Sequence, residues 1–133
     1  MVLVDSSVWI AWLRGEANAA VHQLTALLDE GEACLAPVVL QEVLQGARNA
    51  SALRTLRRRF TALPILVGAD PVATHLEAAE IYARCRWAGV TPRSPHDCLI
   101  AAHAIEHSVA LLHDDADYER IGTVDKRLKL LPR

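Results

Sequence analysis

Short apolar runs alternate along this chain with longer segments that carry helix signals, and this alternation is the feature that most restricts its fold. The runs are residues 1–4, 33–36 and 109–112, with a further candidate at 128–131. Continuous apolar runs of this length are typical of strands that are buried on both faces. Such strands belong to parallel sheets, whose connections are helices. The sequence therefore predicts an α/β fold in which helices cover both faces of a central, mostly parallel sheet.

Helix signals fill the stretches between these runs. Prolines stand at favoured first-turn positions at residues 37 and 95, and glycines at residues 15, 31 and 89 mark helix ends. Residues 63–67 are apolar but contain Pro64, which favours the edge of a sheet. The expected helices span residues 6–13, 19–28, 37–47, 51–62, 71–88 and 95–107, and residues 114–121 are expected to form a turn or a short helix.

Composition narrows the class of protein further. The 133 residues are 52% apolar and 23% charged, which fits one globular domain over residues 1–133. The net charge of −2 means that any nucleic-acid site must be a local patch or depend on a metal ion. Three scattered cysteines fit a reducing compartment, and no apolar run reaches the ~20 residues of a membrane span. With no secretion signal at the N-terminus, we expect a cytoplasmic protein without a membrane partner.

Acidic residues stand where one end of the expected sheet should lie. They follow the strand ends or open the neighbouring helices. They are Asp5, Glu42, Asp97, Asp114, Asp115 and Asp117. Because ligands in parallel α/β folds bind beyond the carboxyl ends of the strands, these acids are expected to converge at one edge of the sheet.

Carboxylates that lie close together repel one another and raise one another's pKa values. A fold keeps them together when a cation sits between them, and carboxylate and water ligands suit Mg²⁺ or Mn²⁺. One such ion, or two about 4 Å apart, can activate water and stabilise the leaving oxygen of a phosphodiester. The residue types therefore favour metal-dependent cleavage of phosphodiester bonds.

Each acid also has a simpler interpretation. Asp5 is placed to cap the following helix, and Glu42 falls outside the apolar stripe of its own helix, as a solvated residue would. Asp97 stands three residues after the expected cap Ser94, where a negative charge favours the helix dipole. Residues 114–117 resemble an ordinary acidic turn. The functional interpretation therefore depends on the shared location of these residues.

Four segments of the chain resemble the motifs of PIN-domain ribonucleases, most closely those of VapC toxins from bacterial toxin–antitoxin pairs. The segments are Val4–Ile10, Leu40–Gly46, Arg93–Ala102 and His113–Ile121. They occur in the right order and spacing, and the resemblance covers essentially the whole chain. It implies an α/β/α sandwich, Mg²⁺ or Mn²⁺ as cofactor, and endonucleolytic cleavage of RNA. It also implies a cognate antitoxin that blocks the acidic pocket, and a toxin homodimer.

The same resemblance assigns catalytic roles to four acids by position. They are Asp5, Glu42, Asp97 and Asp115. The fourth acid of the family pattern lies three residues before an aromatic residue, which here is Tyr118 instead of the usual Phe. Asp115 fits this spacing, whereas Asp114 has no counterpart.

Our hypothesis from the sequence is that Asp5, Asp97 and Asp115 hold the principal metal ion. Glu42 would orient or deprotonate the attacking water. Asp117 is expected to be an accessory ligand that holds a second ion or the water shell of the first. In-line attack on the phosphate would leave a 3′-hydroxyl and a 5′-phosphate.

Other side chains are expected to support the site or bind substrate. Ser7 resembles the small hydroxyl residue that supports the acids of the family. Arg93 and Arg48 lie close in sequence to the proposed ligands, so each is expected to contact RNA or to neutralise the carboxylates. The arginines of residues 54–59 either contact phosphates or form a solvated helix face.

Trp9 and Trp12 are three residues apart on one helical face. They either line a groove for the antitoxin or belong to the core. The core interpretation is favoured for Trp9, and the sequence leaves Trp12 open.

Three other classes remain possible from the sequence. His103-Ala104-Ile105-Glu106-His107 matches the H-x-x-E-H pattern of some zinc proteases, but a third protein ligand is hard to find. A non-catalytic binding module would keep the acidic pocket only for assembly with an antitoxin. A receiver-like phosphoacceptor domain also gathers acids, but it needs a well-placed lysine, and Lys126 and Lys129 are poorly placed for that role.

Overall fold

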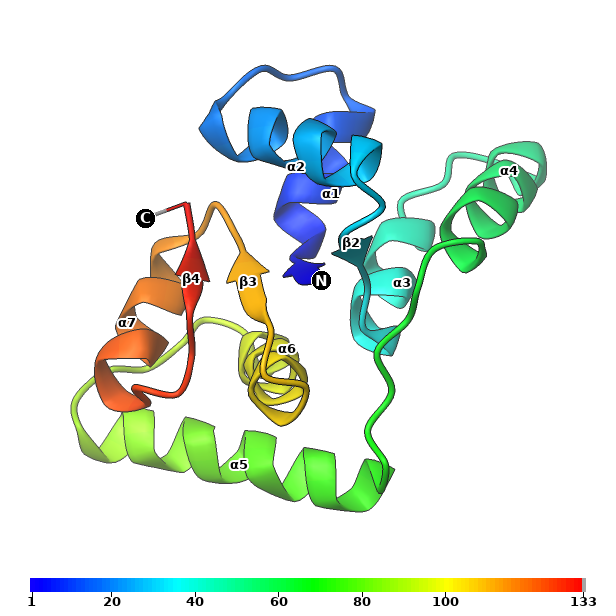
Figure 1. The fold of residues 1–133 in the computed structure, drawn as a ribbon. Coiled ribbons are helices and arrows are strands. Elements are labelled where there is room, and N and C mark those ends of the chain that lie inside the picture. Colours follow the sequence, from blue (N-terminus) through cyan, green and yellow to red (C-terminus); the bar gives the residue numbers. More distant parts are fainter. Residues whose placement is uncertain (133) are drawn as a thin grey trace.

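The computed structural model describes residues 1–132 and has the α/β architecture that the sequence predicts (Figure 1). In chain order, its elements are β1 (Val2–Val4), α1 (Ser6–Leu13), α2 (Ala19–Asp29), β2 (Ala33–Cys34), α3 (Pro37–Leu44), α4 (Ala50–Thr61), α5 (Pro71–Trp87), α6 (Pro95–Glu106), β3 (Ala110–Leu112), α7 (Ala116–Val124) and β4 (Leu130–Leu131). Among the described residues, no helix combines the length and the hydropathy needed to cross a membrane.

All four strands are parallel, in the order β2-β1-β3-β4. The run 33–36 is only partly strand, because Leu35 bridges to Ile65 and Ala36 caps α3. That bridge places residues 63–67 beside β2 at the edge of the sheet, as Pro64 suggested. Residues 114–121, which were expected to form a turn or a short helix, contribute to α7.

Helices cover both faces of the sheet. In Figure 1, α1 and α2 lie on one side of the strands, and α5 and α6 lie on the other. Helix α7 packs against α5 and α6. The central strands are buried from both sides, since Leu3, Val4, Leu111 and Leu112 are all 0% exposed. Polar and apolar residues do not alternate along these strands because neither face of the sheet is exposed to solvent.

The adjacency of β1 and β3 is the feature that builds the site. Because these strands are parallel neighbours, their carboxyl ends lie side by side. The backbone N–H of Asp5, directly after β1, donates to the carbonyl of Leu112 at the end of β3 at 2.9 Å. This pairing brings Asp5 next to the loop that leads into α7, although the two segments lie more than 100 residues apart in the sequence.

Candidate metal centre

Asp5 caps α1 and is held on both of its carboxylate oxygens. The backbone N–H of Ser7 donates to Oδ2 at 3.0 Å, and the Ser7 hydroxyl donates to the same atom at 2.5 Å. The Tyr118 hydroxyl donates to Oδ1 at 2.5 Å. Asp5 is only 4% exposed, so these three bonds fix a buried carboxylate. The capping role is present, and Ser7 contacts the acid that it was expected to support.

Asp97, Asp115 and Asp117 form a compact group of carboxylates. Each offers one oxygen, and these oxygens lie within 4.8 Å of one another. Asp97 lies in the first turn of α6, Asp115 caps α7, and Asp117 lies in the first turn of α7. Two helix starts therefore meet beyond the carboxyl ends of β1 and β3. Carboxylate oxygens grouped in this way are a donor set that suits a hard divalent cation.

The pKa of Asp97 shows that negative charge accumulates in this group. Burial raises the pKa of the Asp97 carboxyl to about 7, and the charge of Asp5 adds to this effect. Asp115 and Asp117 act in the same direction, while the nearby Tyr118 hydroxyl opposes them. Asp5 lies outside the trio of oxygens within 4.8 Å of one another, but it is close enough for its charge to act on Asp97. A bound cation would relieve this repulsion.

Glu42 reaches the cluster from α3. Its Oε1 accepts a hydrogen bond from the Ser6 hydroxyl at 3.2 Å, and its Oε2 lies 3.7 Å from Nδ1 of His96. Burial and the charge of Asp5 raise the pKa of Glu42, while Ser6 and His96 lower it. The half-buried position shows that Glu42 is not simply a solvated helix residue, as its periodicity had suggested.

Asp117 is balanced by two arginines. Its Oδ2 accepts from the backbone N–H of Arg93 at 3.0 Å and from Nε of Arg93 at 3.1 Å. Its Oδ1 accepts from Nη1 of Arg120 at 2.6 Å. Burial would raise the pKa of Asp117, but the hydrogen bonds from Arg93 and Arg120 outweigh it and lower the pKa. Arg93 also donates from Nη2 to Asp115 at 3.0 Å. The charge of Asp117 is thus already compensated, unlike that of Asp97.

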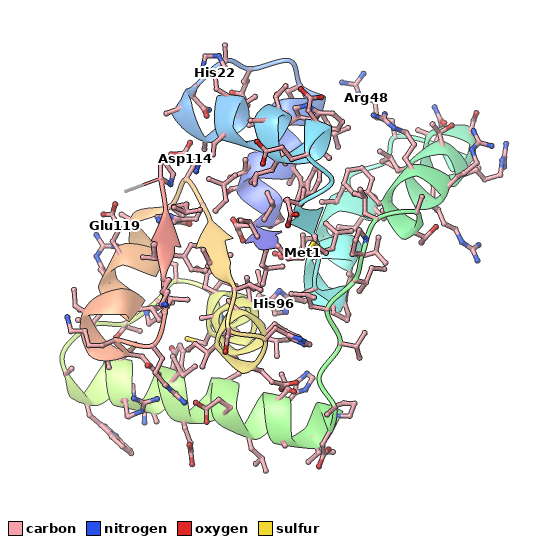
Figure 2. The ribbon with its side chains drawn as sticks, viewed as in Figure 1. Met1, His22, Arg48, His96, Asp114 and Glu119 are labelled. Atoms are coloured by element: carbon pink, nitrogen blue, oxygen red, sulfur yellow. The ribbon has the colours of Figure 1, made fainter. Side chains whose placement is uncertain are left out.

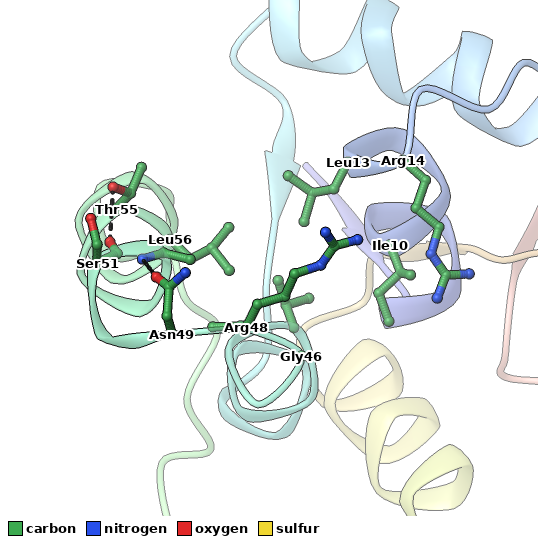
Figure 3. A pocket seen from close by; sticks show the side chains of 12 residues that line it. Ile10, Leu13, Arg14, Gly46, Arg48, Asn49, Ser51, Thr55 and Leu56 are labelled. Carbon is green, nitrogen blue, oxygen red and sulfur yellow. Dashed lines mark hydrogen bonds between the residues drawn. The ribbon is translucent and has the colours of Figure 1, made fainter.

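Arg48 lies apart from these acids. It lines a groove of about 700 Å³ between α1 and α4, together with Ile10, Leu13 and Arg14 (Figure 3). Within residues 1–132 it forms no ion pair with any carboxylate of the cluster. Figure 2 labels Arg48 and His96, and the two lie well separated in that view. The structure therefore places Arg93, but not Arg48, in contact with the acids.

The two tryptophans of α1 have different environments. Trp9 is 0% exposed and packs edge-on against Phe60, with ring centroids 5.1 Å apart. Trp12 is half-buried, and the guanidinium of Arg59 lies 5.4 Å from its ring centroid. Trp9 is therefore a core residue, whereas Trp12 lies at the surface between α1 and α4. Arg54, the first arginine of α4, is exposed.

The H-x-x-E-H residues of α6 have structural partners. His103 is 5% exposed, and its Nδ1 lies 2.8 Å from a backbone carbonyl one turn earlier. Nε2 of His107 lies 3.1 Å from the carbonyl of Val67. Glu106 accepts from the Thr74 hydroxyl at 2.8 Å and from a backbone N–H at 3.1 Å. These contacts fix the segment before α5 onto α6, and in the described residues this trio does not form a metal-ligand group.

Three contacts were not anticipated from the sequence. They are the Tyr118 hydroxyl on Asp5, the imidazole of His96 beside Glu42, and Arg120 on Asp117. The i, i+3 spacing of Asp117 and Arg120 on a helix was a usable signal for the last of these. The other two contacts join segments far apart in the chain, so local spacing held no signal for them.

Comparisons with known proteins agree with this architecture. The chain is 38% identical over 127 residues to Ribonuclease VapC11 of Mycobacterium tuberculosis, covering 93% of each chain. A crystal structure of VapBC2 from Rickettsia felis, bound to a DNA fragment from its promoter, has the same fold, with a TM-score of 0.71 at 15% identity over 98% of this chain and 97% of that one. DNA-bound VapBC from Salmonella typhimurium is also similar, with a TM-score of 0.70 at 18% identity over 97% and 95% of the two chains. Residues 2–124 match the PIN domain. The chain therefore belongs to the PIN domain family.

Proposed function

We propose that this chain is the toxin of a type II toxin–antitoxin pair and acts as a Mg²⁺-dependent endoribonuclease. The observation that supports the proposal is the convergence of Asp5, Glu42, Asp97 and Asp115 from four separate segments into one partly buried acidic group. Its relative VapC11 is named a ribonuclease. RNA as substrate and three free, buried cysteines both suit a cytoplasmic location.

The donor set fits Mg²⁺, with Mn²⁺ as an alternative. Asp5, Asp97 and Asp115 would hold the ion, because Asp97 and Asp115 belong to the group of close oxygens and the charge of Asp5 acts on Asp97. A divalent ion there supplies an activated water and stabilises the leaving oxygen of a phosphodiester. Asp117, whose charge is balanced by arginines, would support the ion only indirectly, through its water shell.

The remaining side chains have distinct roles in this proposal. Glu42 orients the attacking water and accepts its proton, and its raised pKa suits a general base. Asp117 anchors Arg93, whose side chain is 76% exposed at the rim of the acids and binds the RNA phosphate. Attack in line with the departing 3′-oxygen would leave a 3′-hydroxyl and a 5′-phosphate.

The antitoxin would occupy the groove between α1 and α4. Its wall carries the apolar side chains of Ile10, Leu13 and Leu56, and Arg14 and Arg48 lie beside them (Figure 3). An amphipathic segment with acidic residues complements this combination in shape and charge. The similar solved structures are of VapBC, which supports a VapB-type antitoxin as partner. We assign Arg48 to this partner interface in preference to RNA, because it lines the groove and lies apart from the acids.

A homodimer would use the outer face of α5. Val72, Leu76 and Trp87 are 68%, 63% and 76% exposed, and their spacing places them on one side of the helix. Leu76 and Trp87 also line a shallow groove with Glu80 and Arg84. Two antiparallel copies of this face would bury the apolar stripe and pair opposite charges across a two-fold axis.

The test is cleavage of total RNA by antitoxin-free protein, with and without Mg²⁺, followed by mapping of the cut ends. We expect cleavage only with Mg²⁺. Asp97→Asn should abolish it, while Asp114→Asn, which removes the same charge from an exposed position beside the site, should not. Intact RNA in the presence of Mg²⁺ would favour a non-catalytic binding module, and cleavage by Asp97→Asn at the wild-type rate would contradict the assignment of the acids.

A further inference from the structure

The Tyr118 hydroxyl lies inside the acidic cluster. Tyr118 is 0% exposed and donates to Oδ1 of Asp5 at 2.5 Å. Its ring packs against His113, with centroids 5.4 Å apart, which holds the phenol in one orientation. A phenol carries a proton at neutral pH, so this hydroxyl is a hydrogen-bond donor to Asp5.

The hydrogen bonds on Asp5 leave little of its carboxylate free. An ionised carboxylate has about four acceptor positions, two on each oxygen. The N–H and hydroxyl of Ser7 occupy the two positions on Oδ2, and Tyr118 occupies one on Oδ1. One position remains, on Oδ1. Asp5 can therefore offer a cation a single oxygen, on the same atom that Tyr118 holds.

We propose that Tyr118 is a positioning residue, whose hydroxyl fixes the Asp5 carboxylate so that the one free position on Oδ1 faces the metal ion. The proposal deepens the metal site proposed above and depends on it. The carboxylate is planar, so rotation about the Cβ–Cγ bond moves both oxygens together, and Ser7 opposes that rotation only at Oδ2. The added bond from Tyr118 stops that rotation, and groups that orient a ligand in this way typically change metal affinity by about 10–100-fold.

The experiment measures Mn²⁺ affinity of antitoxin-free protein by calorimetric titration and by the electron paramagnetic resonance signal of free Mn²⁺. We expect Tyr118→Phe to bind Mn²⁺ about tenfold more weakly than wild type. Tyr82→Phe is the matched control, because it removes the hydroxyl of a half-buried tyrosine on α5 that does not contact the acids. It should bind Mn²⁺ as wild type does. Wild-type affinity in folded Tyr118→Phe would overturn the proposal.

The dependence of RNA cleavage on Mg²⁺ concentration distinguishes a positioning role of Tyr118 from a purely structural one. In Tyr118→Phe, the Mg²⁺ concentration for half-maximal RNA cleavage should rise about tenfold, with a smaller change in kcat at saturating Mg²⁺. A purely structural role would lower thermal stability and leave the Mg²⁺ requirement unchanged, which would overturn the proposal.

A measurement on the unmodified chain guards against a variant that fails to fold. Mg²⁺ binding at Asp5 should perturb the near-ultraviolet absorption of the phenol bonded to it, and Tyr82→Phe should keep that signal. If the wild-type protein binds Mn²⁺ without this spectral change, the role of Tyr118 is contradicted but the metal site is not. A wild-type protein that binds no Mn²⁺ contradicts the metal site itself, and with it the proposed function.

Discussion

The Oδ2 atom of Asp117 accepts two hydrogen bonds from Arg93, one from the backbone N–H of Arg93 at 3.0 Å and one from its Nε at 3.1 Å. The double contact orients the guanidinium over the edge of the acidic cluster, where its Nη2 also reaches Asp115. A cation is thereby held next to carboxylates that repel one another, with 76% of its side chain still exposed to incoming substrate. This geometry combines charge compensation with phosphate recognition, the two roles that the sequence left open for Arg93.

Replacing Arg93 by Gln should impair RNA binding more than the chemical step. A charge-assisted hydrogen bond to phosphate contributes about 1.5–3 kcal/mol, which corresponds to a rise in KM of roughly 10–100-fold. Steady-state cleavage of a model oligoribonucleotide measures the effect. Arg48→Gln is the matched control, because Arg48 lies in the groove between α1 and α4. Equal losses in the two variants would contradict a specific role for Arg93.

The stability of the metal-free protein should depend on pH through Asp97. Burial, together with the neighbouring charges, raises the pKa of Asp97 to about 7, compared with about 4 in an unfolded chain. The folded state therefore holds a proton that the unfolded state releases, so the stabilising contribution is complete below about pH 4 and is lost as the pH rises through about 7. We expect the free energy of unfolding to fall by a few kcal/mol between about pH 5 and about pH 8.

Urea unfolding in the presence of a chelator measures this dependence. Asp97→Asn should flatten it and should raise stability at neutral pH, because the variant removes a repelled charge. Added Mg²⁺ should stabilise the wild type most at the alkaline end. An unchanged pH dependence in Asp97→Asn would show that other groups cause it.

The sequence predicts the strands and the acidic edge because both depend on short-range patterns. Val2–Val4 and Ala110–Leu112 are continuous apolar runs; Asp5 follows the first directly, and Asp115 lies three residues after the second. Parallel pairing then determines that these ends meet. The convergence of these acids can therefore be predicted without knowing any side-chain contact between distant segments.

The surroundings of Trp9 and Glu42 could not be decided from the sequence, because they depend on contacts between distant segments. Trp9 is buried because Phe60 of α4 packs on it, and no spacing within α1 reveals that partner. Glu42 faces away from the apolar stripe of α3, but Ser6 and His96 build a polar site against that side. In each case, the environment of the side chain comes from another helix.

Gly68 should be intolerant of a side chain. A Cβ atom added at this position would lie 2.0 Å from Oγ1 of Thr74, and Thr74 cannot move aside because its hydroxyl bonds to Glu106 at 2.8 Å. We expect Gly68→Ala to lower the free energy of unfolding by about 1–3 kcal/mol, a typical cost of overpacking. Gly46→Ala is the control, because its added Cβ would meet only a backbone oxygen at 3.5 Å. Chemical denaturation of both variants compares them, and equal stability would contradict the close contact.

Replacing Trp87 by Ser should convert the proposed homodimer into a monomer without unfolding it. Trp87 is 76% exposed, so its loss should change the stability of the isolated fold by only about 0.5 kcal/mol. In a two-fold interface, however, the same substitution removes two large aromatic side chains from the buried stripe, and aromatic side chains of this kind carry much of the binding energy of an interface. Light scattering coupled to size-exclusion chromatography measures the mass of each variant.

The control for Trp87→Ser is Leu53→Ser, because Leu53 is an exposed apolar residue of α4 at 43% exposure, away from α5. It should remain dimeric, since exposure alone does not make an interface. If Trp87→Ser remained dimeric as well, the interface would lie on another face. In that case Leu76→Ser should also remain dimeric. At a true α5 interface, Leu76→Ser should weaken the dimer as Trp87→Ser does, because both side chains line the same groove.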